Sequence, residues 1–335
     1  MKKLASMVLL AVAAALPIGA HAEVSELHIP LGAGGFGFLP LHMMQKHHLI
    51  EKHAEKAGQK VTVNWANIGG PSVMIDALLS GSADFISAGP PSFLILWDKT
   101  KRNADVKGVA AMSSMPMRLN ARAPHLRSID DLKETDKIAV TSIKSSIPSI
   151  IMQMYATKKF GKDQAFHFDP YTVTMNHSDA AVALISGSSN ISAHYASPPL
   201  DRRELKDPAI RTIMNSDDIM GGSTTFTMVS TTKRFHDKNP KVYAAFVNAL
   251  KEAQTMIMSD KRGAAQVLID SMGGGSAWSV DEMVEILNDP STKYTTRPEN
   301  VMKYAHFMND IGSLKHRPSS IDELFFKEAD VLSGN

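Results

Sequence analysis

The sequence predicts an α/β protein of two lobes, each a mostly parallel sheet flanked by helices. Short β-rich segments alternate with helical segments along the first two thirds of the chain, and one block of helix, strand and turn occurs twice. Strands that alternate with helices favour parallel pairing, because each helix carries the chain back across the sheet. With 335 residues, 44% of them hydrophobic and 21% charged, the chain can bury one large or two ordinary cores.

Residues 1–22 are predicted to be a cleaved secretory signal. Met1-Lys-Lys3 is cationic, the apolar stretch to Ala20 is shorter than the roughly 20 residues a membrane-spanning helix needs, and Ala20-His-Ala22 fits a signal peptidase site. A retained anchor helix is the alternative. Cleavage would remove two lysines and no acid, taking the net charge from +2 to 0. We therefore expect a periplasmic protein.

Composition also restricts the function. The chain contains no cysteine, which excludes disulfides, thiolate catalysis and thiolate zinc sites. The balanced charge gives no electrostatic footprint for nucleic acid. We expect a monomer that needs no cofactor.

Turn and cap residues delimit the expected elements. Pro71 and Gly81 bracket a helix at 72–80, and Ser145-Ser146 opens a helix that runs to Gly161. From Pro240 onward the pattern is mostly helical. The expected strands are 61–65, 84–87 and 137–140, and the other expected helices are 92–97, 242–259, 263–271, 280–287 and 299–311.

An internal repeat supports two lobes of one design. Ala77-Leu-Leu-Ser-Gly81-Ser recurs as Ala183-Leu-Ile-Ser-Gly187-Ser, and in each copy a short strand follows and ends in a Pro-Pro pair, at Pro90 and at Pro198. Coincidence in a chain rich in these residues is the alternative. Because ligands gather beyond the carboxyl ends of parallel strands, two such lobes predict a cleft between them.

The loops expected to line this cleft are rich in glycine and serine. They hold one lysine, one histidine and no carboxylate, which disfavours a cationic ligand and suits an oxyanion at helix N-termini. Aromatic residues in and beside them, Phe36, Phe38, Phe93 and Tyr195, suggest that the solute also has an apolar part. The loops are 34–38, 67–72, 88–92, 142–149 and 193–199, and the candidate ligand-binding residues are Gly35, Phe36, Asn67, Gly69, Gly70, Gly89, Pro90, Ser114, Lys144, Ser145, Ser146, His194 and Tyr195.

Plainer interpretations of several candidates stay open. Lys144 could be a solvated loop lysine, Ser145 and Ser146 could serve only as helix caps, and His194 and Tyr195 could end a buried strand. Asp179, at another strand-to-helix turn, could face the cleft and would weaken the charge argument.

Two motifs suggest other chemistry, but each lacks a feature that this chemistry requires. The three glycines from Gly32 to Gly37 match a dinucleotide fingerprint, but the next strand offers Asn64 and no acid for the ribose. The histidines at 42, 47, 48 and 53 lack the i,i+4 spacing of helical metal ligands, so we interpret them as exposed helix residues. We predict no catalytic and no metal-binding residues.

Together these segments resemble the solute-binding proteins of ABC importers, in particular the group that binds aliphatic sulfonates, taurine, nitrate and thiamine-pyrimidine precursors. The resemblance rests on the secretory signal, the glycine turn at 32–37, the two repeat copies, Asp130-Asp-Leu-Lys133 with Lys137-Ile-Ala-Val140, and Ser197-Pro-Pro199, and it extends to Ile321–Phe326. It departs at Glu134, and after Asn190, where the family has an acidic residue and then a tryptophan-proline pair. One pocket wall is therefore replaced.

The resemblance implies the type II periplasmic-binding-protein fold. Lobe 1 would comprise 23–114 plus 226–335, completed by the C-terminal helices, and lobe 2 would comprise 115–225, with hinges near 115–119 and 224–229. It implies a protein without enzymatic activity that delivers a small organic solute to a membrane permease with a cytoplasmic ATPase. Two alternatives are a pyrimidine-precursor synthase-like enzyme on the same scaffold, needing a base such as His167 or His194, and a ligand-sensing domain.

Overall fold

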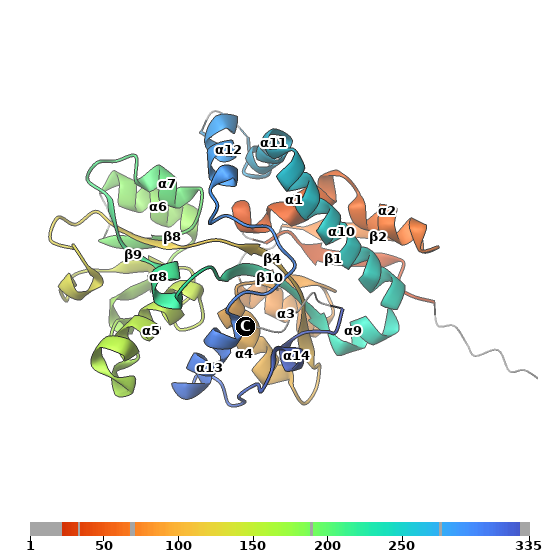
Figure 1. Ribbon diagram of the computed structural model, residues 1–335, viewed down its shortest axis with the longest axis horizontal. Helices are drawn as coiled ribbons and strands as arrows, with labels where there is room; N and C mark the ends of the chain where they lie inside the picture. The colour runs from red at the N-terminus through yellow and green to blue at the C-terminus, as the bar shows by residue number, and fades with distance from the viewer. Residues whose placement is uncertain (1–21, 33, 68–70, 188–189, 275–276, 329–335) are drawn as a thin grey trace, which may run out of the picture.

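The computed structural model describes residues 22–32, 34–67, 71–187, 190–274 and 277–328, which form two lobes side by side (Figure 1). The predicted signal, apart from Ala22, and the candidate residues Gly69 and Gly70 lie outside these described residues. Within the described part, every helix is too short or too polar to cross a membrane.

The first lobe contains two small sheets. Strand β1 (Glu26–Pro30) pairs parallel with β2 (Thr62–Ala66), while β10 (Thr225–Thr232) pairs antiparallel with β3 (Ile86–Ala88) and β4 (Val106–Ser114). Two hydrogen bonds between His28 and Asp84 join the sheets. The backbone amide of His28 donates to the Asp84 carboxylate, and the backbone amide of Asp84 donates to the His28 carbonyl.

The second lobe contains one five-stranded sheet in the order β7-β6-β8-β5-β9. Strand β6 lies parallel to β7 and β8, and β5 lies antiparallel to β8 and β9. The bounds are β5 (Arg118–Ala121), β6 (Ile138–Val140), β7 (Thr172–Thr174), β8 (Ala193–Ala196) and β9 (Arg211–Asn215). The α/β class and the two lobes are confirmed, but the sheets are mixed. Every antiparallel pair of named strands includes β5 or β10, the first strand after the chain leaves the first lobe and the strand with which it re-enters that lobe.

Helices cover both lobes. The helices expected after Pro240 are present within one or two residues of their predicted ends, since proline, glycine and cap residues mark them. The bounds are α1 (Leu39–Lys46), α2 (Leu49–Lys56), α3 (Pro71–Ser80), α4 (Pro90–Thr100), α5 (Ile147–Phe160), α6 (His177–Ser186), α7 (Leu200–Glu204), α8 (Ser216–Met220), α9 (Lys233–Lys238), α10 (Pro240–Ser259), α11 (Lys261–Ser271), α12 (Val280–Asn288), α13 (Val301–Asp310) and α14 (Ile321–Leu324).

The sequence repeat corresponds to a structural one. Helix α3 ends at Gly81 and leads through β3 to Pro90, and α6 ends at Gly187 and leads through β8 to Pro198. Both glycines have a positive φ, 80° and 64°, the conformation in which glycine ends a helix at no steric cost.

Two large apolar clusters stabilise the molecule. The first lies under α1, α2, α10, α11 and α12 and includes Phe85 stacked on Phe246 at 4.0 Å between ring centroids. The second fills the five-stranded lobe and continues into α4 and α13, joining Phe93 and Tyr304 to Ile150. Apolar packing therefore crosses the lobe boundaries expected near residues 115 and 225, which stay predictions.

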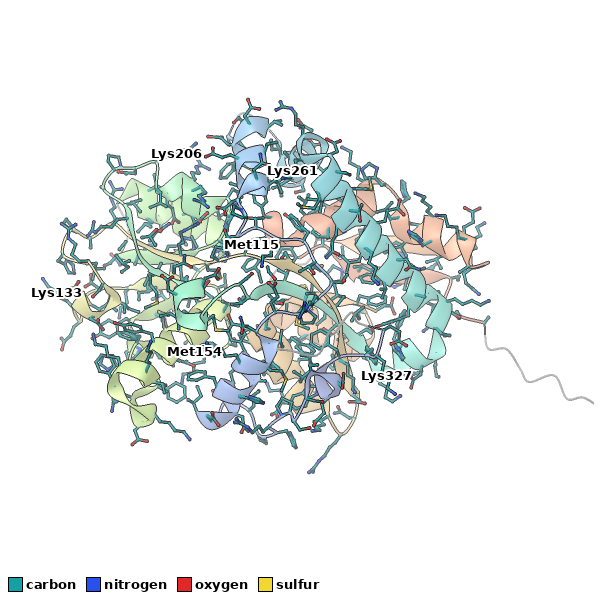
Figure 2. The ribbon with its side chains drawn as sticks, in the orientation of Figure 1. Met115, Lys133, Met154, Lys206, Lys261 and Lys327 are labelled. Atoms are coloured by element: carbon teal, nitrogen blue, oxygen red, sulfur yellow. The ribbon has the colours of Figure 1, made fainter. Side chains whose placement is uncertain are left out.

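The chain passes between the lobes at 115–117 and 221–224, near the predicted hinges. Figure 2 shows Met115 in the middle of the molecule, whereas Lys133 lies at the far end of the second lobe. Met115 is 2% exposed.

Candidate functional site

Where the predicted cleft loops of the two lobes meet, the chain makes two close backbone approaches and one hydrogen bond between the lobes. We call this region the interlobe line. A Cβ placed on Gly35 would lie 3.6 Å from the Pro198 carbonyl oxygen, and one on Gly89 would lie 3.0 Å from Ile147 Cδ1. The Ser92 hydroxyl donates a hydrogen bond to the Ser145 carbonyl oxygen at 3.0 Å. The structure thus brings together Gly35, Gly89 and Ser145 with partners from the opposite lobe.

The N-terminus of α5 is held by a serine network. Ser146 caps the helix, because its Oγ accepts from the Ser149 amide at 3.4 Å and donates to the Ser142 carbonyl at 2.6 Å. The hydroxyls of Ser142 and Ser145 are 2.6 Å apart. This network fixes the Ser145 carbonyl where Ser92 reaches it, so the predicted capping role of Ser146 is confirmed.

Three further candidates are buried in the first lobe. Phe36 is fully buried and its carbonyl accepts from the Tyr294 hydroxyl at 2.9 Å. Pro90 is buried at the start of α4, and Ser114 ends β4, where its amide and carbonyl bond to Lys293.

Lys144 and Asn67 lie at the surface. Lys144 is exposed, with its Nζ 5.8 Å from the Phe166 ring centroid, and it also interacts with Asp169. Asn67 is exposed immediately after β2. Since the Lys144 amine faces residues of its own lobe, its predicted anion contact gains no support from this arrangement.

His194 and Tyr195 lie inside β8, 1% and 0% exposed. Tyr195 packs in the second apolar cluster, and Phe36, Phe38 and Phe93 are likewise at most 9% exposed. The aromatic side chains that suggested an apolar part of the solute therefore pack within the protein, because each stands on an inward face of its strand or helix.

His194 belongs to a buried chain of hydrogen bonds. Its Nδ1 lies 2.5 Å from Glu204 Oε1, and its Nε2 lies 2.9 Å from His177 Nδ1. Burial raises the pKa of Glu204 to about 8, and desolvation lowers the pKa of His194 to about 3. Glu204 thus keeps its proton, and its carboxylic acid group donates a hydrogen bond to Nδ1 of a neutral His194. Glu204 is 0% exposed and His194 is 1% exposed, so neither side chain is accessible to a solute.

Asn120 and Thr212 complete this chain. The Asn120 amide donates to Glu204 Oε2 at 2.8 Å, and its carbonyl oxygen accepts from the Thr212 hydroxyl at 2.7 Å. Beside it, the buried Asp201 forms an ion pair with Arg118. Both acids come from α7, so these contacts bind that short helix to the sheet.

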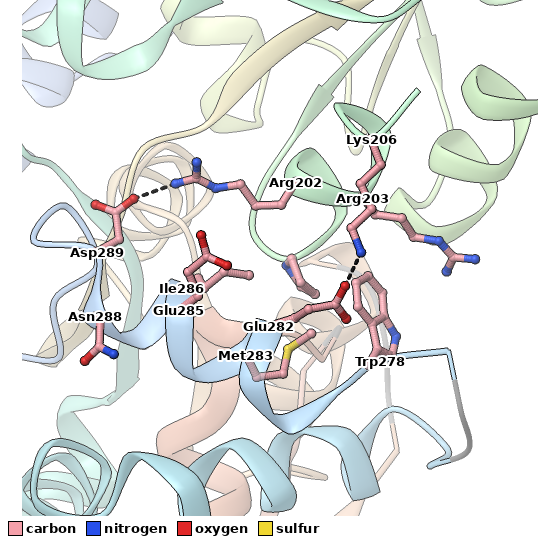
Figure 3. A pocket seen from close by; sticks show the side chains of 11 residues that line it. Arg202, Arg203, Lys206, Trp278, Glu282, Met283, Glu285, Ile286, Asn288 and Asp289 are labelled. Atoms are coloured by element: carbon pink, nitrogen blue, oxygen red, sulfur yellow. Dashed lines mark hydrogen bonds and ion pairs between the residues drawn. The ribbon is translucent and has the colours of Figure 1, made fainter. Parts of the chain in front are cut away.

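A pocket of about 330 Å³ separates α7 from α12, a site that the sequence analysis missed (Figure 3). Basic residues of α7 and the residues after it face acidic residues of α12 across an apolar floor. The available signal was the basic residues after Pro199 and the acidic residues of the predicted helix 280–287, but α7 itself is too short to show helical periodicity. The lining residues are Pro199, Arg202, Arg203, Lys206, Trp278, Glu282, Met283, Glu285, Ile286, Asn288 and Asp289.

The histidines near α1 and α2 are only partly as predicted. His47 and His48 are exposed, but His42 is 8% exposed because it stands on the inward face of α1, and burial lowers its pKa. His53 is partly buried and bonds to Glu252 at 2.7 Å. Among the described residues, no group of three or more His, Cys, Asp or Glu side chains is placed to hold a metal ion.

Comparison with known proteins places this geometry in a known fold. No family model and no curated protein sequence matches the chain. Among solved structures, a protein of Bordetella bronchiseptica RB50 has a TM-score of 0.71 at 19% identity, covering 91% of this chain and 96% of that one.

Two similar structures have known ligand classes. The alkanesulfonate-binding protein SsuA of Xanthomonas axonopodis, bound to MOPS, has a TM-score of 0.66 at 18% identity over 88% of this chain and 96% of its own. The nitrate-binding protein NrtA of Synechocystis has 0.66 at 13%, over 90% and 84%. The chain therefore has the two-lobed fold of periplasmic binding proteins, as the sequence resemblance implied.

Proposed function

We propose that this protein is the periplasmic solute-binding component of an ABC-type importer, which captures a small organic anion between its lobes and delivers it to a permease. The observation that carries the proposal is that the predicted cleft loops of the two lobes lie against each other along the interlobe line. Loops at equivalent points of the two repeat copies both lie close to the opposite lobe, Gly89 beside Ile147 and Pro198 beside Gly35. A solute held there would touch both lobes, and such contacts favour a closed state.

The preference for an anion is argued from the helices that end at this line. The N-termini of α4 and α5 meet where Ser92 bonds to Ser145, and helix N-termini carry partial positive charge. Proline occupies the first two positions of α4 and the second position of α5, so hydroxyls and the helix dipoles supply most of the attraction. Similar structures that bind a sulfonate buffer and nitrate agree with this choice.

A thermal-shift screen of residues 23–335 tests the binding role. The panel contains alkanesulfonates, nitrate, carboxylates, aromatic acids, pyrimidines and polyamines. A solute at 100 times its Kd stabilises the folded state by about 2.7 kcal/mol, which gives a measurable rise in Tm. Shifts by anions alone are the expected result, and a shift by polyamines alone would overturn the proposed charge preference.

Delivery to a permease needs a separate measurement. Deletion of the gene is expected to abolish uptake of the solute that the screen identifies, and the plasmid-borne gene should restore it. Binding in vitro with unchanged uptake would instead indicate a ligand sensor.

A further inference from the structure

The two lobes meet along two edges of opposite character. On one edge α5 packs against α4 and α13, where the apolar side chains of Phe93, Ile150 and Tyr304 belong to one buried cluster. On the other edge α7 faces α12 across the pocket described above (Figure 3), and the contacts there are charged.

Three contacts cross from α7 and the residues after it to the α12 region. Arg202 Nη2 lies 2.5 Å from Asp289 Oδ2, and Lys206 forms an ion pair with Glu282. The Arg203 guanidinium lies 5.2 Å from the Trp278 ring centroid, within range of a cation–π interaction. These charges stay in contact with water, since the side chain of Lys206 is 61% exposed and that of Glu282 is 36% exposed.

Each of the two helices is anchored in its own lobe. Helix α7 is bound to the five-stranded sheet through Asp201 with Arg118 and Glu204 with Asn120. Helix α12 buries Met283, Ile286 and Leu287 in the first apolar cluster. If the lobes separate at this edge, the three charged contacts must therefore break, while the contacts within each lobe remain.

Breaking an exposed ion pair requires little free energy, because water solvates both charges again. Exposing an apolar cluster to water requires much more. We infer that the lobes part along the α7–α12 edge, with the α5–α4–α13 edge as the fixed side, and that Arg202, Arg203 and Lys206 form a clasp that sets the closed fraction of the solute-free protein. This inference rests on the proposed function, because a solute-capturing protein must open to load.

The absence of cysteine from the sequence allows spin labels to be placed cleanly. Val182→Cys with Gln266→Cys reports the clasp edge, since both positions are exposed and lie on α6 and α11, which pack against α7 and α12. Lys158→Cys with Lys315→Cys reports the opposite edge, between α5 and the segment whose amide bonds to Asp98 of α4. Double electron–electron resonance between the two spin labels then gives the distance distribution at each edge in the solute-free protein.

Lys206→Glu places two like charges at the clasp and is expected to lower the ratio of closed to open molecules about five- to tenfold. Adding Glu282→Gln removes the repulsion, retains an N3 side chain suited to the helix cap, and should recover part of the ratio. Lys233→Glu is the matched control, because Lys233 pairs with Asp237 within one helix. The distance at the α5 edge should stay constant throughout.

Raising salt from about 0.1 M to about 1 M, which shortens the screening length from about 10 Å to about 3 Å, should shift the wild-type protein in the same direction. Unchanged distances at the α7–α12 edge in Lys206→Glu and in high salt would overturn the clasp. Widening at the α5 edge instead would overturn the assigned direction of opening. Neither outcome depends on solute, so failure here is distinct from failure of the thermal-shift screen.

Discussion

At the scale of single residues, α7 carries two buried acids in different protonation states. Asp201 faces the Arg118 guanidinium and forms an ion pair, although burial raises its pKa. Glu204, one helical turn later, faces the neutral His194 and Asn120, so nothing there compensates a negative charge. An ionised carboxyl without a cation in such a site is costly, which is why Glu204 keeps its proton.

This arrangement predicts an unusual loss of stability at mildly alkaline pH. The pKa of Glu204 is about 8 in the folded protein and near 4.5 in the unfolded chain, so between these values only the folded state holds the proton. Stability therefore falls as pH rises through this window. Glu204→Gln imitates the protonated acid and should remove about 2 kcal/mol of the loss between about pH 6.5 and 8, measured by urea unfolding.

The two histidines of the same hydrogen-bonded chain determine how stability changes at acid pH. The pKa of His177 and that of His194 are both about 3 in the folded protein, because of desolvation, against 6.5 in the unfolded chain. The unfolded state binds more protons below about pH 6.5, so stability falls as pH falls. Maximal stability near pH 6.5 is the combined result. An equal fall in the free energy of unfolding above about pH 6.5 in wild type and in Glu204→Gln would contradict the assignment of this loss to Glu204. The variant Glu134→Gln, at an exposed position, is the control.

At the scale of elements, α5 depends on its serine cap. The Ser146 hydroxyl bonds to both the Ser149 amide and the Ser142 carbonyl. Ser146→Ala should therefore lower the free energy of unfolding by about 1 kcal/mol, as loss of an N-cap does. Ser145→Ala, which leaves the cap and the carbonyl bonded to Ser92, should cost less. An equal loss in both variants, measured by urea unfolding, would show that the cap is not the source.

The turn before α1 depends on a glycine. A Cβ on Gly37 would lie 2.4 Å from Phe226 Cε1 and 2.9 Å from Thr227 Cγ2, and the Gly37 carbonyl already accepts the Thr227 hydroxyl at 2.6 Å. Gly37→Ala should destabilise by about 1 to 3 kcal/mol through overpacking. Phe226→Leu in the same chain should recover part of this in thermal unfolding, and no recovery would locate the strain elsewhere.

These elements also show what a sequence can predict. Proline, serine and glycine gave the ends of α3, α5 and α10 because they act through local backbone chemistry. The position of His194 within β8 depends instead on pairing with β5, more than 70 residues earlier, and no local pattern encodes it. The contacts of α7 with α12 likewise join segments that are far apart in the chain. Among the candidates, Gly35, Gly89 and Ser145 lie where the two lobes meet, whereas His194 and Tyr195 are buried within a strand; ligand binding by any of them stays a prediction.

At the scale of the whole molecule, the fit of the two lobes along the α5–α4–α13 edge depends on the spacing at Gly89, the residue before α4. Its backbone is extended, with φ −72° and ψ 157°, so alanine fits the local conformation. The added Cβ would lie 3.0 Å from Ile147 Cδ1 of the opposite lobe and 3.3 Å from the Phe226 carbonyl oxygen. Both spacings are tighter than ordinary contact, and the first can be relieved by a small shift of the Ile147 side chain at the start of α5.

Gly89→Ala should therefore weaken binding of a solute found in the thermal-shift screen about tenfold, while the Tm of the solute-free protein changes little. Ile147→Val deletes Cδ1, the nearest atom, and costs about 0.5 to 1.5 kcal/mol of stability alone. In the double variant the two effects on affinity should add incompletely, because the shortest contact is gone while Cγ1 of residue 147, at 3.2 Å, remains. Titration calorimetry on the four proteins of this cycle measures the coupling. Strictly additive losses would mean that Gly89 and Ile147 act independently, and that their spacing across the α5–α4–α13 edge does not control affinity.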